Sequence, residues 1–299
     1  MDKKIYNVGL VLNSTVEEYK DFLDKYVEYI DSIYFSLPLG ERFHSRIKIR
    51  DQFRIKSVVD TFWKILKLIK TYDIKLELVL NTYRLNDNDI EISSRELKRH
   101  NIEVDSIAIL DEYYDAANKC FPKQKKVFSY NNGIRSVEDL KKISNKYDSY
   151  VLGSNLMRDL SVKKYIVDEL KSEVILMVNN GCSFNCHFCR NSNLCITVFE
   201  NNLKHKSINE LYAEQSFFPS ELKEELVKNY NYNNLIKISC RSSNLNYLYK
   251  CMDSYIDCEE EKYITIAPNN YNLWCRLAVF GDYYEKLDYN RIKLIKKWM

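Results

Sequence analysis

Short apolar runs rich in β-branched residues alternate with amphipathic stretches from the N-terminus to about residue 257. Runs of this kind are typical of buried parallel strands, and we expect strands at Val8–Leu12, Ser32–Leu37, Lys75–Leu80, Ser106–Leu110, Lys126–Ser129, Ser149–Leu152, Glu173–Val178 and Leu235–Ser239. The stretches between them have helical spacing and predict helices at Val16–Ile30, Ser57–Lys70, Ser93–His100, Ser136–Lys146, Val162–Leu170 and Asn244–Asp257. Capping residues precede three of these helices: Ser14 or Thr15, then Ser136, then Ser161.

Eight strands separated by helices match a (β/α)8 barrel, an α/β fold in which each parallel pair needs a crossover helix. An open doubly wound sheet is the main alternative. Its first strand is normally followed by a glycine-rich turn, which this chain lacks, and the chain has six glycines in all. We therefore expect a barrel over residues 1–258, with residues 259–299 packing on it as a C-terminal extension.

In such a barrel the functional residues lie at the C-terminal ends of the strands. Polar residues follow most of the predicted strands: Asn13, Asn81, Asp111, Tyr130–Asn132, Ser154–Asn155, Asn179–Cys182 and Cys240–Arg241. Arg158 and Arg241 are candidates for binding a substrate carboxylate or phosphate, although surface ion pairs would account for them equally well. Asp111 is a candidate general base, although acidic residues also favour helix N-termini for electrostatic reasons alone.

Charge and hydropathy narrow the class of protein. The 45 basic and 42 acidic residues leave a net charge of +3, which gives no electrostatic footprint for nucleic acid but leaves room for a local basic patch. No apolar run follows a positive segment in residues 1–30, and no stretch of about 18 apolar residues occurs. We expect a cytoplasmic protein with no membrane partner. The serine-hydrolase and zinc-protease motifs are also absent.

Nine cysteines are unusual for a reducing compartment, where disulfides are rare, and an odd number favours metal binding or reactive thiols. Cys182, Cys186 and Cys189 form a C-x3-C-x2-C motif. Thiolates at such short spacing can bind one iron–sulfur cluster, and we expect a 4Fe–4S cluster. Asn179, Asn180 and Gly181, immediately before the motif, suit a tight loop at the cofactor. Zinc stays an alternative, because His187 or His205 would complete a Cys3His site.

Two cysteines are candidates for the fourth ligand of the cluster. Proximity in sequence favours Cys195, whereas Cys240 follows strand eight, the neighbour of strand seven in a closed barrel. If only three thiolates bind, one iron keeps a coordination site for a substrate or cofactor.

The C-x3-C-x2-C spacing, with Phe188 before the last cysteine, resembles the radical S-adenosylmethionine enzymes. That resemblance implies S-adenosylmethionine as a second cofactor at an open iron. Two features depart from the family pattern. The motif normally follows the first barrel strand and here follows the seventh, and the acidic glycine-rich segment that binds the cofactor's amino group is not visible.

A second resemblance covers roughly residues 125–255. The stretch from Val178 to Phe188 resembles the V-N-E-G-C…C-P-F/Y segment of the peptidase U32 family. Farther on, Phe218–Leu222 resembles that family's R-P-E-D-L segment, and Leu235–Ser242 resembles its F-K-I-x-G-R-x-S strand. The resemblance implies a TIM barrel with a cysteine-bound 4Fe–4S cluster and, in some members, oxygen-independent hydroxylation. Departures are Asn180 for an acidic residue, Cys189 for arginine and Cys240 for glycine.

We therefore expect an iron–sulfur redox enzyme of U32-like type that acts on a small molecule or a modified macromolecule with electrons from a donor protein. One alternative is a radical S-adenosylmethionine enzyme. Another is a non-catalytic barrel, half of a hetero-dimer, in which the cluster or a zinc ion is structural.

Overall fold

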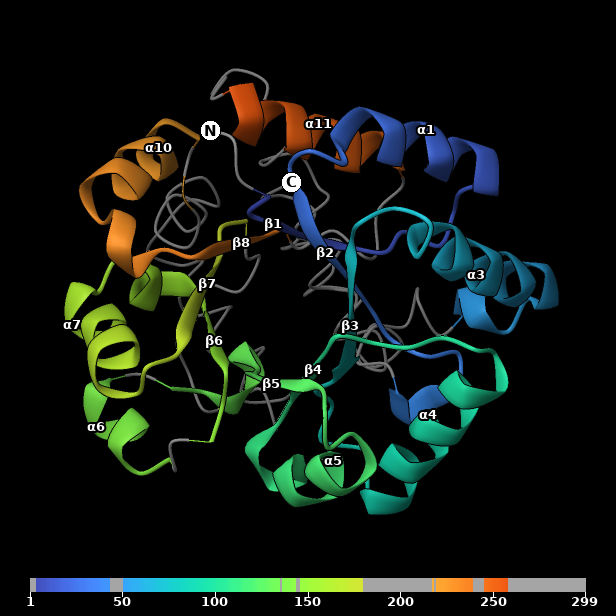
Figure 1. Ribbon diagram of the computed structural model, residues 1–299, viewed down its shortest axis with the longest axis horizontal. Coiled ribbons are helices and arrows are strands. Elements are labelled where there is room, and N and C mark those ends of the chain that lie inside the picture. The colour runs from blue at the N-terminus through green and yellow to red at the C-terminus, as the bar shows by residue number, and fades with distance from the viewer. Residues whose placement is uncertain are drawn as a thin grey trace, which may run out of the picture.

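The computed structural model describes residues 4–43, 51–134, 136–143, 146–179, 217, 219–238 and 245–257. Its eight strands are all parallel and follow one another around a closed barrel, with β8 pairing with β1 (Figure 1). They are β1 (Tyr6–Gly9), β2 (Ile30–Phe35), β3 (Lys75–Leu80), β4 (Ser106–Ile109), β5 (Lys125–Phe128), β6 (Ser149–Leu152), β7 (Glu173–Met177) and β8 (Leu235–Ile238). The predicted (β/α)8 barrel is confirmed. The predicted extension over residues 259–299 lies outside the described residues.

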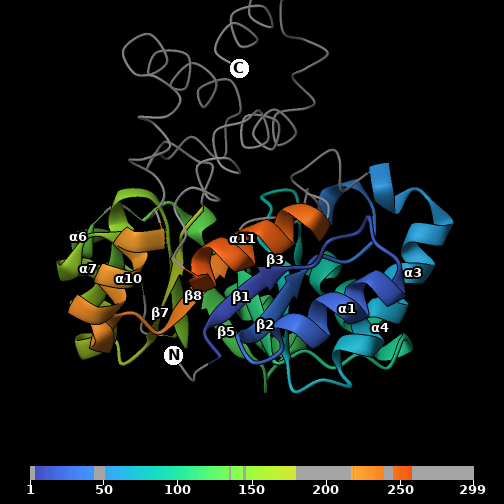
Figure 2. The same cartoon turned by 90° about the horizontal axis from the view of Figure 1, so that it is seen from above.

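Helices surround the ring of strands, and the view from above shows α1 and α11 alongside β1 and β8 (Figures 1 and 2). The α-helices are α1 (Val16–Tyr26), α3 (Lys56–Ile69), α4 (Asp87–Arg99), α5 (Tyr114–Cys120), α6 (Val137–Lys141), α7 (Leu160–Lys164), α10 (Pro219–Lys228) and α11 (Leu245–Asp257). Shorter helical turns are η1 (Glu41–Phe43), η2 (Asp111–Tyr113), η3 (Tyr130–Asn132), η4 (Ser154–Met157), the π-helical η5 (Tyr165–Glu169) and η7 (Tyr230–Tyr232). The sequence pattern did not predict α5 or α10.

Side-chain caps fix where several helices begin. Thr15 accepts a hydrogen bond from the backbone N–H of Glu18 at 3.1 Å, and Glu18 returns one, so α1 starts with a capping box. Ser136 caps α6, as predicted. The prediction that Ser161 caps the next helix is wrong, because Asp159 accepts from the Ser161 N–H at 2.9 Å and α7 begins at Leu160, two residues earlier than predicted. A carboxylate also suits the positive end of the helix dipole better than a hydroxyl does.

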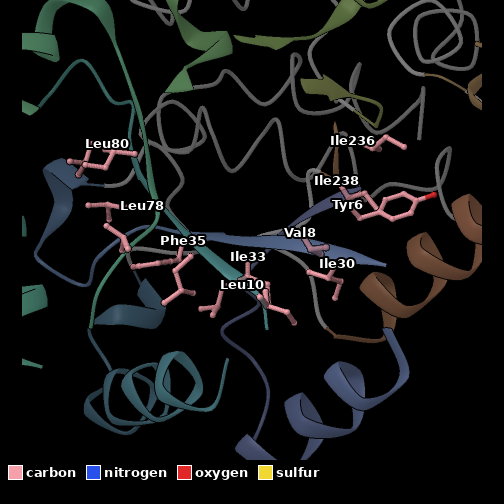
Figure 3. Packing of buried hydrophobic residues seen from close by; sticks show 14 of the residues in the cluster. Tyr6, Val8, Leu10, Ile30, Ile33, Phe35, Leu78, Leu80, Ile236 and Ile238 are labelled. Atoms are coloured by element: carbon pink, nitrogen blue, oxygen red, sulfur yellow. The ribbon is translucent and has the colours of Figure 1, made fainter. Parts of the chain in front are cut away.

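Alternate residues of β2 to β7 belong to two separate apolar clusters, whereas Tyr6 and Val8 of β1 both belong to the outer one. The outer cluster packs between the strands and the helices, and Figure 3 shows part of it around Val8, Ile33, Phe35 and Leu78. The second cluster fills the inside of the barrel, which we call the lumen; it consists of Tyr34, Val79, Ala108, Val127, Val151 and Ile175. Because strand side chains alternate between faces, this division gives the direction of the strand residues, except at the start of β2, where the register shifts after Ile30.

A charged pair lies within the lumen. Lys237 stands between Ile236 and Ile238 of the outer cluster, so its side chain points inward, where its ammonium group binds the carboxylate of Glu77 from β3. Both side chains are less than a tenth exposed. The Tyr34 ring covers the ammonium group at 4.2 Å, and the Tyr34 hydroxyl donates to the Ile238 carbonyl at 2.7 Å. The pair therefore links β8 to β3 through the inside of the barrel.

Removing one partner of this pair leaves a buried charge without compensation. We expect Lys237→Met to lower the free energy of unfolding by about 3–5 kcal/mol, measured by urea denaturation. The double variant Glu77→Gln/Lys237→Met should lose clearly less than the single variant, since no buried charge is left. Equal losses in the single and double variants would contradict the ion pair.

Candidate functional site

The C-terminal ends of the strands form one face of the barrel, the mouth, and polar side chains there are bound to one another. The Asn81 amide after β3 donates to the Ser129 hydroxyl after β5 at 2.9 Å, and the Asn131 amide donates to the Asn81 carbonyl at 3.1 Å. The Tyr83 hydroxyl donates to the Asn131 carbonyl. These four residues, which we call the rim, bring amide groups from two strand ends together at the mouth, where they can bind a polar substrate.

Asn132 ties the end of β4 to the rim. Its amide donates to the Ile109 carbonyl at 3.1 Å and to the Ser129 carbonyl at 3.0 Å, while its side-chain oxygen accepts from the Asp111 N–H at 2.7 Å. Gly133 follows with φ +76°, a left-handed conformation that a glycine adopts without strain. Asn81, Asn131 and Asn132, three of the polar residues predicted at the strand ends, thus form part of the mouth.

The Asp111 carboxylate contacts residues on the outside of the barrel. It accepts a hydrogen bond from the Tyr147 hydroxyl at 2.7 Å and lies 3.2 Å from the Lys146 ammonium group. Tyr147 belongs to the outer apolar cluster, and burial together with the Asp111 contact raises the pKa of its hydroxyl. The hydroxyl therefore stays protonated and keeps donating to Asp111. The assignment of Asp111 as a general base stays a prediction.

The chain leaves the end of β7 and returns to the same place. The Phe217 N–H donates to the Val178 carbonyl at 2.9 Å, and the Val178 N–H donates to the Lys237 carbonyl of β8 at 3.2 Å. The Phe217 carbonyl accepts from the Tyr255 hydroxyl of α11 at 3.0 Å. We call the contact between Val178 and Phe217 the base of the cysteine segment, because the segment between them contains Cys182, Cys186, Cys189 and Cys195.

Arg158 contacts the returning chain. Its guanidinium group lies 4.4 Å from the centre of the Phe217 ring and 3.1 Å from the Glu221 carboxylate of α10. Stacking on an aromatic ring and pairing with a carboxylate both suit the planar guanidinium better than a lysine ammonium. The arginine predicted to bind substrate thus holds the start of α10 against the segment after β6.

A second cation contacts α10 one helical turn later. Lys163 of α7 is fully buried, and its ammonium group binds the Glu225 carboxylate and, at 3.2 Å, the side-chain oxygen of Asn233. Burial lowers the pKa of Lys163, whereas the contact with Glu225 opposes that shift. Since Glu221 and Glu225 are four residues apart, they lie on one face of α10 and meet the two cations together.

The cysteine ligands and their neighbours lie outside the described residues. These are the predicted metal ligands Cys182, Cys186, Cys189, Cys195 and Cys240, the loop residues Asn180 and Gly181, and the candidate anion-binding Arg241. Asn179 is described; it lies two residues after the end of β7 and is 1% exposed. Within the described ranges, no group of three or more His, Cys, Asp or Glu side chains is arranged to hold a metal ion.

The sequence patterns did not single out Glu77 and Lys237. A charged residue flanked by two apolar residues in a buried strand was the available sign, as in Leu76-Glu77-Leu78 and Ile236-Lys237-Ile238. Such residues are buried almost only when paired. Their pairing across 160 residues of chain, however, follows only from the closed barrel.

The fold defines this protein as a closed, parallel, eight-stranded barrel with a polar mouth. Solved structures with a similar fold include a U32 peptidase, which is 11% identical at a TM-score of 0.48, the match covering 80% of this chain and 94% of that one. N-acetylneuraminate lyase from Mycoplasma synoviae is 11% identical at a TM-score of 0.41, covering 88% and 78%. Tryptophan synthase from Pyrococcus furiosus is 12% identical at 0.46, covering 87% and 96%.

Sequence identities and TM-scores this low indicate a shared barrel fold and carry no argument about activity. No family model matches the sequence, and no curated protein does either. In the described part of the chain, no helix has both the length and the apolar character needed to cross a membrane.

We expect Arg158→Ala to loosen the base of the cysteine segment. Losing a partly exposed ring contact and ion pair costs about 1–2 kcal/mol. Hydrogen exchange at the Phe217 N–H should then become about tenfold faster, since 1.4 kcal/mol corresponds to a factor of ten. The exchange rate at Phe217 in Arg158→Lys should lie between the rates in the wild-type protein and in Arg158→Ala.

Arg99→Ala is the matched control, because Arg99 is exposed and, among the described residues, is paired with Glu96 of its own helix at 3.4 Å. It should leave exchange at Phe217 unchanged. Unchanged exchange in Arg158→Ala as well would show that Arg158 does not hold the returning chain.

Proposed function

We propose that this protein is an iron–sulfur enzyme in which a 4Fe–4S cluster, bound by Cys182, Cys186 and Cys189, lies beside the barrel mouth. The observation that supports this best is the base of the cysteine segment, the 2.9 Å hydrogen bond between Phe217 and Val178. Because of this hydrogen bond, both ends of the cysteine segment lie at the C-terminal end of β7. In barrel enzymes, catalytic residues come from this end of the strands.

The donor set fits such a cluster. Cysteine thiolates are the usual ligands of iron–sulfur clusters, and the segment offers four of them. A fifth, Cys240, comes two residues after the end of β8, which pairs with β7. Either Cys195 or Cys240 is therefore a candidate fourth ligand. When bound, a cluster of this kind supplies one-electron transfer.

Residues of the chain would bind and orient the substrate. The rim amides of Asn81 and Asn131 are placed to orient a polar small molecule or the modified part of a macromolecule. Arg241, three residues after Ile238, is proposed to bind a carboxylate or phosphate of that substrate. Arg158 would act through α10 by holding the base of the segment. We propose redox chemistry of U32-like type in the cytoplasm, with electrons from a donor protein.

Metal analysis after anaerobic purification tests the proposal. We expect about four iron and four sulfide per chain, as the cluster's formula requires. The triple variant Cys182→Ala/Cys186→Ala/Cys189→Ala should lose them. Cys120→Ala is the control. Cys120 lies at the end of α5, outside the cysteine segment, so this variant should retain its iron. Zinc at one equivalent without iron would overturn the proposal.

Single variants identify the remaining ligand. Loss of iron in Cys195→Ala or in Cys240→Ala assigns the fourth thiolate, and full retention in both leaves an open iron. Adding S-adenosylmethionine to the reduced protein then separates the two redox classes. Formation of 5′-deoxyadenosine would show a radical S-adenosylmethionine enzyme and contradict the U32-like assignment.

A further inference from the structure

A polar wall lines one side of the lumen. Four consecutive strands around the barrel, β8, β1, β2 and β3, contribute one nearly buried polar side chain each: Lys237, Asn7, Ser32 and Glu77. Lys237, Asn7 and Glu77 each stand between two residues of the outer cluster, so they point inward. Ser32 precedes Ile33 of the outer cluster and lies two residues before Tyr34 of the lumen cluster, so it points inward too. The proposed iron–sulfur function makes no use of this wall.

Asn7 is the centre of the wall. In the strand register it is the direct partner of Ser32 on one side and of Lys237 on the other. Neighbouring strands lie about 4.8 Å apart, so a small molecule in the lumen can reach the Asn7 and Ser32 side chains together.

Two atoms of the wall have no hydrogen-bond partner within the described part of the chain. They are the side-chain oxygen of Asn7, a residue 2% exposed, and the hydroxyl oxygen of Ser32, a residue 3% exposed. Buried polar atoms in proteins are almost always hydrogen-bonded, to protein or to an ordered water molecule. Two such atoms on paired strands, beside a charged pair, indicate a shared ligand.

The chemistry of the wall selects that ligand. An amide oxygen only accepts, so the ligand must donate a hydrogen bond to Asn7, whereas the Ser32 hydroxyl can donate or accept. Glu77 disfavours an anion here, and Lys237 disfavours a cation. A neutral, small donor remains. Buried water molecules typically make about three hydrogen bonds to otherwise unsatisfied groups of this kind.

We propose that the lumen contains a specific site for one ordered water molecule, which bridges Asn7 and Ser32 beside the Lys237–Glu77 pair. The water supplies the hydrogen bonds that the Asn7 and Ser32 oxygens would otherwise lack, and so offsets the cost of burying them. Tyr34 separates it from the mouth, since its ring covers the Lys237 ammonium group and its hydroxyl is bonded to Ile238. The water therefore exchanges slowly with bulk solvent.

Oxygen-17 magnetic relaxation dispersion on the full chain counts such long-lived water molecules. We expect the dispersion amplitude of Asn7→Leu/Ser32→Ala to fall by the equivalent of one water relative to wild type at the same metal content. Ser93→Ala is the control: this hydroxyl is also fully buried but donates to the Asp89 carbonyl at 2.9 Å. Its amplitude should stay at the wild-type value. Equal amplitudes in the double variant and wild type would overturn the proposal.

A second measurement needs no variant. In the wild-type protein, a nuclear Overhauser effect between water and the backbone N–H groups of Asn7 and Ser32 is expected, with the sign of a slowly exchanging water. Its absence at both residues would also overturn the site. Neither measurement depends on whether the cysteines bind iron.

Discussion

The pairing of β1 with β8 closes the barrel, and the features near the mouth depend on this closure. Tyr6 pairs with Ile236 across almost the whole described chain. Once the ring is closed, Lys237 reaches Glu77 through the lumen, and the Tyr34 hydroxyl reaches the Ile238 carbonyl. An open sheet would leave β1 and β8 at opposite edges, far from one another. Closure therefore creates the polar wall and the neighbourhood of β7 and β8.

Register matters as much as closure. Side chains on a strand alternate between faces, so a shift of β8 by one residue would turn Lys237 into the apolar outer layer and bring Ile236 and Ile238 into the lumen. The cost of burying an unpaired ammonium group among apolar side chains opposes that shift. The Lys237–Glu77 pair thus helps to select one register, in addition to any contribution it makes to stability.

The strands could be predicted closely because their signal is local. Lys75–Leu80 and Ser149–Leu152 have the predicted bounds, and the other strands differ by a few residues at their ends. Helix α5 was missed because Tyr114–Cys120 is short and has little helical periodicity, and α10 because its packing depends on partners such as Arg158 and Lys163. The contacts of the mouth were not predictable from single stretches, since each joins residues that are distant in sequence. Asn81 and Asn131 were placed at strand ends, but their mutual hydrogen bonds required the three-dimensional register.

The base of the cysteine segment changes how the predicted site residues relate to one another. Arg158 was a candidate substrate ligand, yet its described contacts are with Phe217 and Glu221, where the chain returns to the barrel. The hydrogen bond between Phe217 and Val178 places both ends of the cysteine segment at the end of β7. The segment's attachment is shared among the end of β7, β8 and α11 through Val178, Lys237 and Tyr255. Rigid elements of this kind hold a functional group in position better than a free loop does. The mouth beside β7 and β8 is therefore the part of this barrel where we propose the cofactor, facing the rim.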